Sequence, residues 1–142
     1  MLSAIHILLT YACTMKCDHC FLYCAPNAPG TFTLEGVKAI IDDAKRMPTV
    51  TSIFFEGGEP FLYYPLLLEG VRIAAQQGFQ TGIVTNGFWG TCVADAKLWL
   101  KPLVDAGLSS LSISNDTLHF GSMKVSPADH ALAAAQEMGI PA

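Results

Sequence analysis

The segment CTMKCDHC, residues 13–20, decides how this chain of 142 residues is interpreted. It places three cysteines, Cys13, Cys17 and Cys20, in one short loop directly after an apolar stretch at residues 4–10. A loop that short brings three thiolates to one small inorganic centre. An iron-sulfur cubane held by only three cysteines leaves one iron without a protein ligand, and that iron can bind a second molecule. The segment therefore predicts chemistry at a metal centre.

Two other uses of these cysteines stay open. A structural zinc site needs four ligands, and Cys24 or His19 can supply the fourth. Zinc ligands usually form two separated pairs, whereas these crowd into one loop, so zinc is the minor alternative. Disulfide bonding fits less well, because five cysteines are an odd number.

A second motif follows the next apolar run. Residues 52–55 are rich in aromatic and branched side chains, and the run leads into Gly57-Gly58-Glu59-Pro60. A glycine pair leaves the main chain open to close approach by a ligand. Glu59 adds a negative charge suited to an ammonium group. Alone, this tetrapeptide is typical of a tight turn; beside the cysteine loop, it indicates a binding site.

Together the two motifs resemble the radical S-adenosylmethionine superfamily. The resemblance rests on the pattern Cys13-x-x-x-Cys17-x-x-Cys20 and on the glycine-glycine-glutamate-proline turn. It implies that the three cysteines bind a [4Fe-4S] cluster, whose open iron is chelated by the amino and carboxylate groups of S-adenosylmethionine. Glu56 departs from the usual pattern, because many members carry a small or hydroxyl residue there.

The resemblance also implies which residues contact the cofactor. Gly57, Gly58 and Glu59 are expected to contact its methionyl amino group, and the backbone of His19 is expected near its adenine. Ser114 and Asp116 are similar to a polar pair that meets the cofactor ribose in some members. For Asp116, capping of the following turn is the alternative.

The roles of several nearby residues stay open at this stage. Thr85 and Asn86 either line the cofactor site or form a plain strand-ending turn. Cys24 is a stray thiol, a reactive residue near substrate or an accidental ligand, and His119 is a candidate for substrate contact.

The spacing of apolar residues predicts strands that alternate with helices. Pro102 is expected to end the third helix early, and residues 140–142 look like the start of a fifth strand. The expected strands are 4–10, 52–55, 81–85 and 108–114, and the expected helices are 33–47, 65–77, 93–100 and 126–139.

This alternation predicts an α/β fold, a partial TIM-type (β/α) barrel with parallel strands and right-handed crossovers. In such folds the chemistry gathers at the carboxyl ends of the strands, where both motifs fall. Along the fourth strand, Ser110, Ser112 and Ser114 share one phase and are expected to face a polar lumen. We expect one domain over residues 1–142, the N-terminal portion of a radical S-adenosylmethionine core with about four β/α units.

The chain is short for a complete barrel of this kind. A barrel of this kind needs roughly 200 residues or more, and the chain stops as the fifth strand begins. We therefore expect a fragment, a truncated reading frame or a half that must associate.

The composition predicts a folded protein with a core of its own, since 51% of residues are hydrophobic and 14% are charged. The formal net charge is −4, without a basic run, so nucleic acid is not an expected partner. No stretch is long and apolar enough for a membrane helix. We expect a cytoplasmic protein.

The resemblance implies an enzyme in which a reduced cluster cleaves S-adenosylmethionine to methionine and a 5'-deoxyadenosyl radical, which abstracts hydrogen from a substrate. No side chain is assigned a catalytic role, because the difficult chemistry belongs to the cofactor. The substrate can be a peptide, a protein or a small molecule, and a reductant such as flavodoxin or ferredoxin is expected. The alternative is a noncatalytic iron-sulfur or zinc-binding module, or an inactive truncated fragment.

Overall fold

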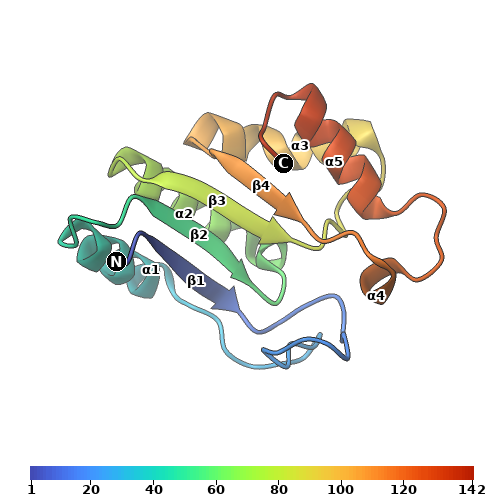
Figure 1. Cartoon of the computed structure of the whole chain (residues 1–142), viewed down its shortest axis with the longest axis horizontal. Helices are drawn as coiled ribbons and strands as arrows, with labels where there is room; N and C mark the ends of the chain where they lie inside the picture. Colours follow the sequence, from blue (N-terminus) through green and yellow to red (C-terminus); the bar gives the residue numbers. More distant parts are fainter.

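A computed structural model describes all residues, 1–142, and shows one four-stranded sheet flanked by helices. The strands are β1 (Ala4–Thr10), β2 (Ser52–Gly57), β3 (Gln80–Thr85) and β4 (Ser110–Ile113). They pair in chain order and are all parallel, so their arrowheads point the same way in Figure 1. The predicted α/β fold with parallel strands that alternate with helices is confirmed.

Helices connect the strands, as parallel pairing requires. They are α1 (Leu34–Lys45), η1 (Pro60–Tyr63), α2 (Tyr64–Gln76), α3 (Val93–Ala106), α4 (Thr117–Phe120) and α5 (Pro127–Glu137). Helix α2 packs on β2 and β3, and α5 packs on β4. None of the helices has both the length and the apolar character needed to cross a membrane.

Sequence signals explain where the helices begin. Thr33 caps α1, since its hydroxyl accepts a hydrogen bond from the backbone N–H of Gly36 at 3.1 Å. Ser126 and Asp129 form a capping box at the start of α5, with Pro127 in the first turn. Gly107 ends α3 in the left-handed conformation, with φ of +107°.

The prediction that Pro102 ends the third helix is wrong, because α3 continues through it to Ala106. A proline removes one helical hydrogen bond, here the one to the carbonyl of Leu98. Leu98 is 71% exposed, so water can satisfy that carbonyl. Leu100 and Leu103 are fully buried on either side of the proline, and their packing holds the helix together.

The end of the chain lies against the free edge of β4. Residues 140–142 are not assigned to a strand. The backbone N–H of Leu111 nevertheless donates to the carbonyl of Pro141 at 2.8 Å. The segment therefore occupies the position where a next strand would pair.

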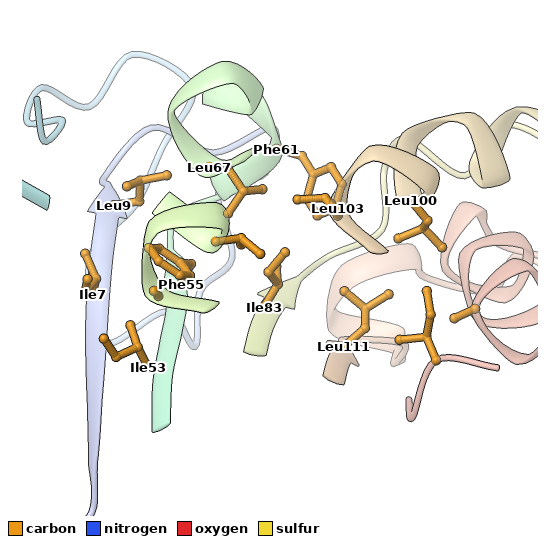
Figure 2. Packing of buried hydrophobic residues seen from close by; sticks show 14 of the residues in the cluster. Ile7, Leu9, Ile53, Phe55, Phe61, Leu67, Ile83, Leu100, Leu103 and Leu111 are labelled. Atoms are coloured by element: carbon orange, nitrogen blue, oxygen red, sulfur yellow. The ribbon is translucent and has the colours of Figure 1, made fainter. Parts of the chain in front are cut away.

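The hydrophobic core lies between the sheet and its helices. Phe55 of β2 and Ile83 of β3 face Leu67 and Leu103 across this layer in Figure 2. Gly70 on α2 makes room for the ring of Phe55, because a Cβ there would lie 2.7 Å from its Cε1 atom. The opposite face of the sheet carries no such layer.

That opposite face is lined by polar and half-buried side chains. His6 and Ser112 are exposed, and Phe54 is half-buried. The His6 ring stacks on Phe54 with ring centres 4.8 Å apart, and its Nδ1 atom lies 2.6 Å from Oε1 of Glu56. The predicted polar phase of β4 thus lies on the helix-free face, while Leu111 points into the core.

Replacing Leu100 with alanine tests the core on α3. We expect the Leu100→Ala variant to lose about 2–5 kcal/mol of unfolding free energy, because a fully buried side chain is removed and a cavity is left. Leu98→Ala, on the exposed side of the same helix, is the matched control and should change stability by about 0.5 kcal/mol or less. Urea denaturation measures both. Equal losses would contradict this packing.

Candidate functional site

A cavity of about 210 Å³ lies at the carboxyl ends of the strands. The loop after β1, the turn after β2 and the ends of β3 and β4 all contribute to its wall. The structure brings together in this wall most of the residues singled out from the sequence: Cys13, Cys17, Cys20, Gly57, Gly58, Ser114 and His19. Glu59 and Asp116 do not line the cavity.

The cysteine loop is closed at its base by the backbone. The N–H of Cys13 donates to the carbonyl of Ala25 at 3.1 Å, and the N–H of Ala25 donates to the carbonyl of Tyr11 at 3.4 Å. The hydroxyl of Thr10 accepts a further bond from the N–H of Ala12 at 3.0 Å. These contacts hold the loop over the end of β1, with Cys13 buried and Cys17 half-buried.

The three thiols differ in how readily they ionise. Burial raises the pKa of Cys13 and of Cys17 above the usual value. Burial acts in the same direction on Cys20, but hydrogen bonds from the backbone and side chain of Cys24 and from the backbone of Leu22 and Tyr23 outweigh it and lower its pKa. Because thiolates are the metal-binding form, the surroundings of Cys20 favour that form, whereas those of Cys13 and Cys17 oppose it.

Gly57 and Gly58 allow the turn after β2 to lie directly against the chain leaving β1. The N–H of Gly58 donates to the carbonyl of Thr10 at 2.7 Å. A Cβ on Gly58 would lie 2.1 Å from the carbonyl oxygen of Ala12, and Gly57 has a φ of +133°. Larger residues cannot occupy this turn without moving the cysteine loop. Both glycines also line the cavity, so their backbone faces the cysteines and any ligand beside them.

Glu59 is placed beneath this turn, with no exposed surface. Its carboxylate accepts hydrogen bonds from the backbone N–H of Asn86 at 2.7 Å, the hydroxyl of Thr85 at 2.7 Å and the backbone N–H of Phe61 at 3.2 Å. Burial raises the pKa of Glu59 to about 7, against these hydrogen bonds, which lower it. The carboxylate therefore ties the turn after β2 to the end of β3.

Thr85 and Asn86, whose roles the sequence left open, connect this network to the cysteine loop. The side-chain amide of Asn86 donates to the hydroxyl of Thr14 at 3.0 Å and approaches Sγ of Cys13 at 3.7 Å. Thr85 also accepts a bond from Nε1 of Trp89 at 3.1 Å. Both residues are buried and line the cavity. Their position after a strand and before a glycine was the sequence signal.

Ser114 and Asp116 take different positions. Ser114 lines the cavity, whereas Asp116 is exposed and caps α4. Its Oδ1 atom accepts bonds from the N–H groups of Leu118 at 2.8 Å and His119 at 3.1 Å. The hydrogen bond from the His119 side chain is the main cause of a lowered pKa for Asp116. The turn-capping alternative for Asp116 is therefore the contact that the structure contains.

His119 approaches the cysteine loop, which the sequence did not reveal. Its ring meets that of His19 edge to face, with centres 5.2 Å apart. One ring nitrogen from each histidine and Sγ of Cys17 all lie within 4.8 Å of one another. The short helix α4 was not predicted, so nothing in the sequence pattern placed His119 beside residues a hundred positions earlier.

Cys24 lies buried beside Cys20 in the wall of the cavity. Burial, with the nearby Cys20, raises the pKa of Cys24 to about 12. A thiol that stays protonated at neutral pH is neither a ready nucleophile nor a ready ligand. Cys92, by contrast, is exposed and caps the start of α3, away from the cavity.

The burial of Glu59 predicts an unusual dependence of stability on pH. Its pKa in the folded chain lies above the ordinary 4.5, so the folded state binds this proton more tightly than the unfolded state. The contribution to stability is complete below pH 4.5 and is lost as the pH rises to about 7. We expect the unfolding free energy of the wild type, relative to Glu59→Gln, to fall by about 3 kcal/mol over this interval.

Urea denaturation at several pH values measures this difference, in which the other titrating groups cancel. Glu35→Gln, at an exposed position in the first turn of α1, is the matched control and should give a profile parallel to the wild type. A difference between wild type and Glu59→Gln that stays constant with pH would show that folding does not raise the pKa of Glu59.

Comparison with known proteins identifies relatives of this chain. The model of the Radical SAM superfamily matches residues 7–141. A tungsten-containing aldehyde ferredoxin oxidoreductase cofactor-modifying protein of Pyrococcus furiosus is 31% identical over 80% of this chain and 31% of its own length. GTP 3',8-cyclase of Chlorobaculum tepidum is 36% identical over 80% of this chain and 33% of its own length.

The fold is also found among solved structures. The structure described as native anSMEcpe with bound AdoMet superposes with a TM-score of 0.67 and 19% identity, over 98% of this chain and 42% of that one. The chain thus spans about a third of the curated relatives named above and less than half of this structure. With a family model that matches nearly its whole length, the chain belongs to the radical S-adenosylmethionine superfamily.

Proposed function

We propose that Cys13, Cys17 and Cys20 hold a [4Fe-4S] cluster and that S-adenosylmethionine binds beside it. The observation that carries this proposal is the convergence of three thiols from one loop on one cavity, opposite the glycine turn. A donor set of three thiolates fits a cluster that keeps one iron open.

When bound, the cluster and S-adenosylmethionine would supply a 5'-deoxyadenosyl radical, formed by reductive cleavage, for hydrogen abstraction from a substrate. In this proposal the backbone of Gly57 and Gly58 receives the methionyl end of the cofactor, and Glu59 holds that turn in place from beneath. Ser114, directly after β4, and Asp116 are the candidates for contact with the ribose, and the backbone of His19 would lie near the adenine. No protein side chain is required to form or break bonds.

The size of the cavity indicates where the cofactor and substrate would extend. At about 210 Å³ it is smaller than the roughly 300–1,000 Å³ of common ligand pockets. A cofactor anchored at the cysteines therefore reaches beyond it, onto the helix-free face of the sheet, where Glu56 and Val84 form its rim. We place the substrate on this face, on the side where His6 pairs with Glu56.

The remaining parts of the proposal follow from the family. The chain would be the N-terminal portion of a radical S-adenosylmethionine core domain, with about four β/α units. Its substrate is a peptide, a protein or a small molecule, and its electrons come from a reductant such as flavodoxin or ferredoxin. A reducing, cytoplasmic location suits a cluster of this kind.

Electron paramagnetic resonance tests the proposal on anaerobically reconstituted, dithionite-reduced protein. We expect a reduced four-iron signal that changes when S-adenosylmethionine is added, because the cofactor binds the open iron directly. The Cys17→Ala variant should lose the signal. Cys92→Ser, which removes an exposed thiol outside the cavity, is the matched control and should keep both the signal and its response.

Two outcomes would contradict the proposal. A chain that takes up no iron, or a signal that S-adenosylmethionine does not change, would leave a noncatalytic metal-binding module. The specific observation that favours this second function is the group formed by Cys17, His19 and His119.

A further inference from the structure

Glu56 supplies the one carboxylate in the wall of the cavity. The other residues that line this cavity include no aspartate, lysine or arginine. The Glu56 side chain is 26% exposed, so its charge is partly withdrawn from water. Withdrawing a charge from water is unfavourable unless a group of opposite charge or a set of hydrogen bonds compensates it. This carboxylate therefore suits a ligand that brings a cation into the cavity.

His6 holds the Glu56 carboxylate from the neighbouring strand. Its Nδ1 atom lies 2.6 Å from Oε1 of Glu56. An ionised carboxylate can only accept, so Nδ1 carries the hydrogen. The His6 ring is fixed by stacking on Phe54, with an angle of 15° between the planes. Phe54 in turn lies over β3, where a Cβ on Gly82 would collide with its ring.

No lysine or arginine of the chain forms an ion pair with Glu56. An imidazole can donate a hydrogen bond without carrying a charge, so His6 orients the carboxylate and does not have to neutralise it. The second carboxylate oxygen, Oε2, has no hydrogen-bond partner within the chain. One oxygen is thus held by His6, and the other is left for a ligand.

The flanks of Glu56 are aliphatic. On β1, Leu8 pairs in register with Glu56. On β3, Ile83 pairs with Phe55, which places Val84 beside Glu56 on the helix-free face of the sheet. Val84 also lines the cavity. A carboxylate between aliphatic side chains fits a ligand with an apolar stem and a charged end, as the side chain of lysine has.

We propose that Glu56 binds an alkylammonium group of the substrate and that His6 is the positioning residue for this contact. The inference rests on the proposed function, which places the substrate on the helix-free face beside the cofactor. Oε2 of Glu56 accepts a charge-assisted hydrogen bond from the ammonium, and the alkyl chain lies against Leu8 and Val84. A lysyl side chain of a peptide and a free aliphatic amine share this chemistry.

Saturation-transfer difference NMR tests the contact with three probes of matched shape, namely pentylammonium, pentanol and pentanoate. Both the cluster-free chain and the anaerobically reconstituted protein with S-adenosylmethionine are titrated. We expect pentylammonium to bind about tenfold more tightly than pentanol, as one charge-assisted hydrogen bond would give. Pentanoate should not bind, because its charge has the same sign as that of Glu56.

Three variants locate the preference for the ammonium. Glu56→Gln keeps the shape of the side chain and should remove the preference. His6→Phe keeps a ring against Phe54 but loses the N–H donor, and should reduce the preference by about threefold while the affinity for pentanol stays unchanged. Glu35→Gln, at an exposed position on α1, is the matched control and should bind all three probes like the wild type. Circular dichroism verifies that each variant is folded.

A peptide probe distinguishes the two sources of the ammonium group. Tighter binding of N-acetyl-glycyl-lysyl-glycinamide than of pentylammonium would identify a lysyl side chain, and the reverse order would identify a free amine. Equal affinities for pentylammonium and pentanol, or an unchanged preference in Glu56→Gln, would overturn the assignment. Displacement of pentylammonium by S-adenosylmethionine would also overturn it, because Glu56 would then bind the amino group of the cofactor.

The result is independent of the test for the cluster. Binding of the probes to the cluster-free chain requires neither iron nor S-adenosylmethionine. A paramagnetic signal that responds to the cofactor, together with no preference for the ammonium, would leave the proposed function in place and remove only the assignment of Glu56. A preference for the ammonium in a chain that takes up no iron would do the opposite.

Discussion

The buried carboxylate of Glu59 is the interaction on which the arrangement of the site depends. It accepts hydrogen bonds from Thr85 and Asn86 at the end of β3 while it sits on the turn that follows β2. The same turn is hydrogen-bonded to the end of β1, because the N–H of Gly58 donates to the carbonyl of Thr10. Three strand ends are thereby joined by one connected set of hydrogen bonds. Asn86 then extends the network to Thr14 in the cysteine loop.

Burying a carboxylate here has an electrostatic consequence for the cysteines. Glu59 is one of the groups that raise the pKa of Cys13, after burial itself. Placing a second negative charge in the same interior is unfavourable, so a thiolate at Cys13 would be stabilised by a bound cation. The pKa of Glu59, raised to about 7, works in the opposite direction, since a protonated Glu59 no longer opposes ionisation of Cys13. The protonation state of Glu59 is therefore coupled to that of Cys13.

The sequence predicted the fold well where local patterns were strong. Strands and helices alternate in the structure as the apolar spacing indicated, and the cysteine loop and the glycine turn meet at one edge of the sheet, as parallel strands require. The prediction that the third helix ends at Pro102 was wrong, because burial of Leu100 and Leu103 outweighs one lost hydrogen bond. The position of His119 was missed for another reason, since α4 has only four residues and little hydrophobic pattern. The placement of Glu59 beneath the turn depends on tertiary contacts that a motif does not describe.

Two arrangements of ligands at one loop raise the question of what selects between metals. Cys13, Cys17 and Cys20 all line the cavity, whereas Sγ of Cys17 also lies within 4.8 Å of one ring nitrogen of each of two histidines. Cys20 has the lowered pKa, so it is prepared to bind a metal, yet it is not part of the histidine group. A metal species that recruits Cys20 is therefore directed to the three-cysteine arrangement. Hydrogen bonds of Asn115 with Asp129 and Ser126 link the segment before α4 to the start of α5. The lowered pKa of Cys20 is thus a feature that distinguishes the three-cysteine arrangement from the histidine group.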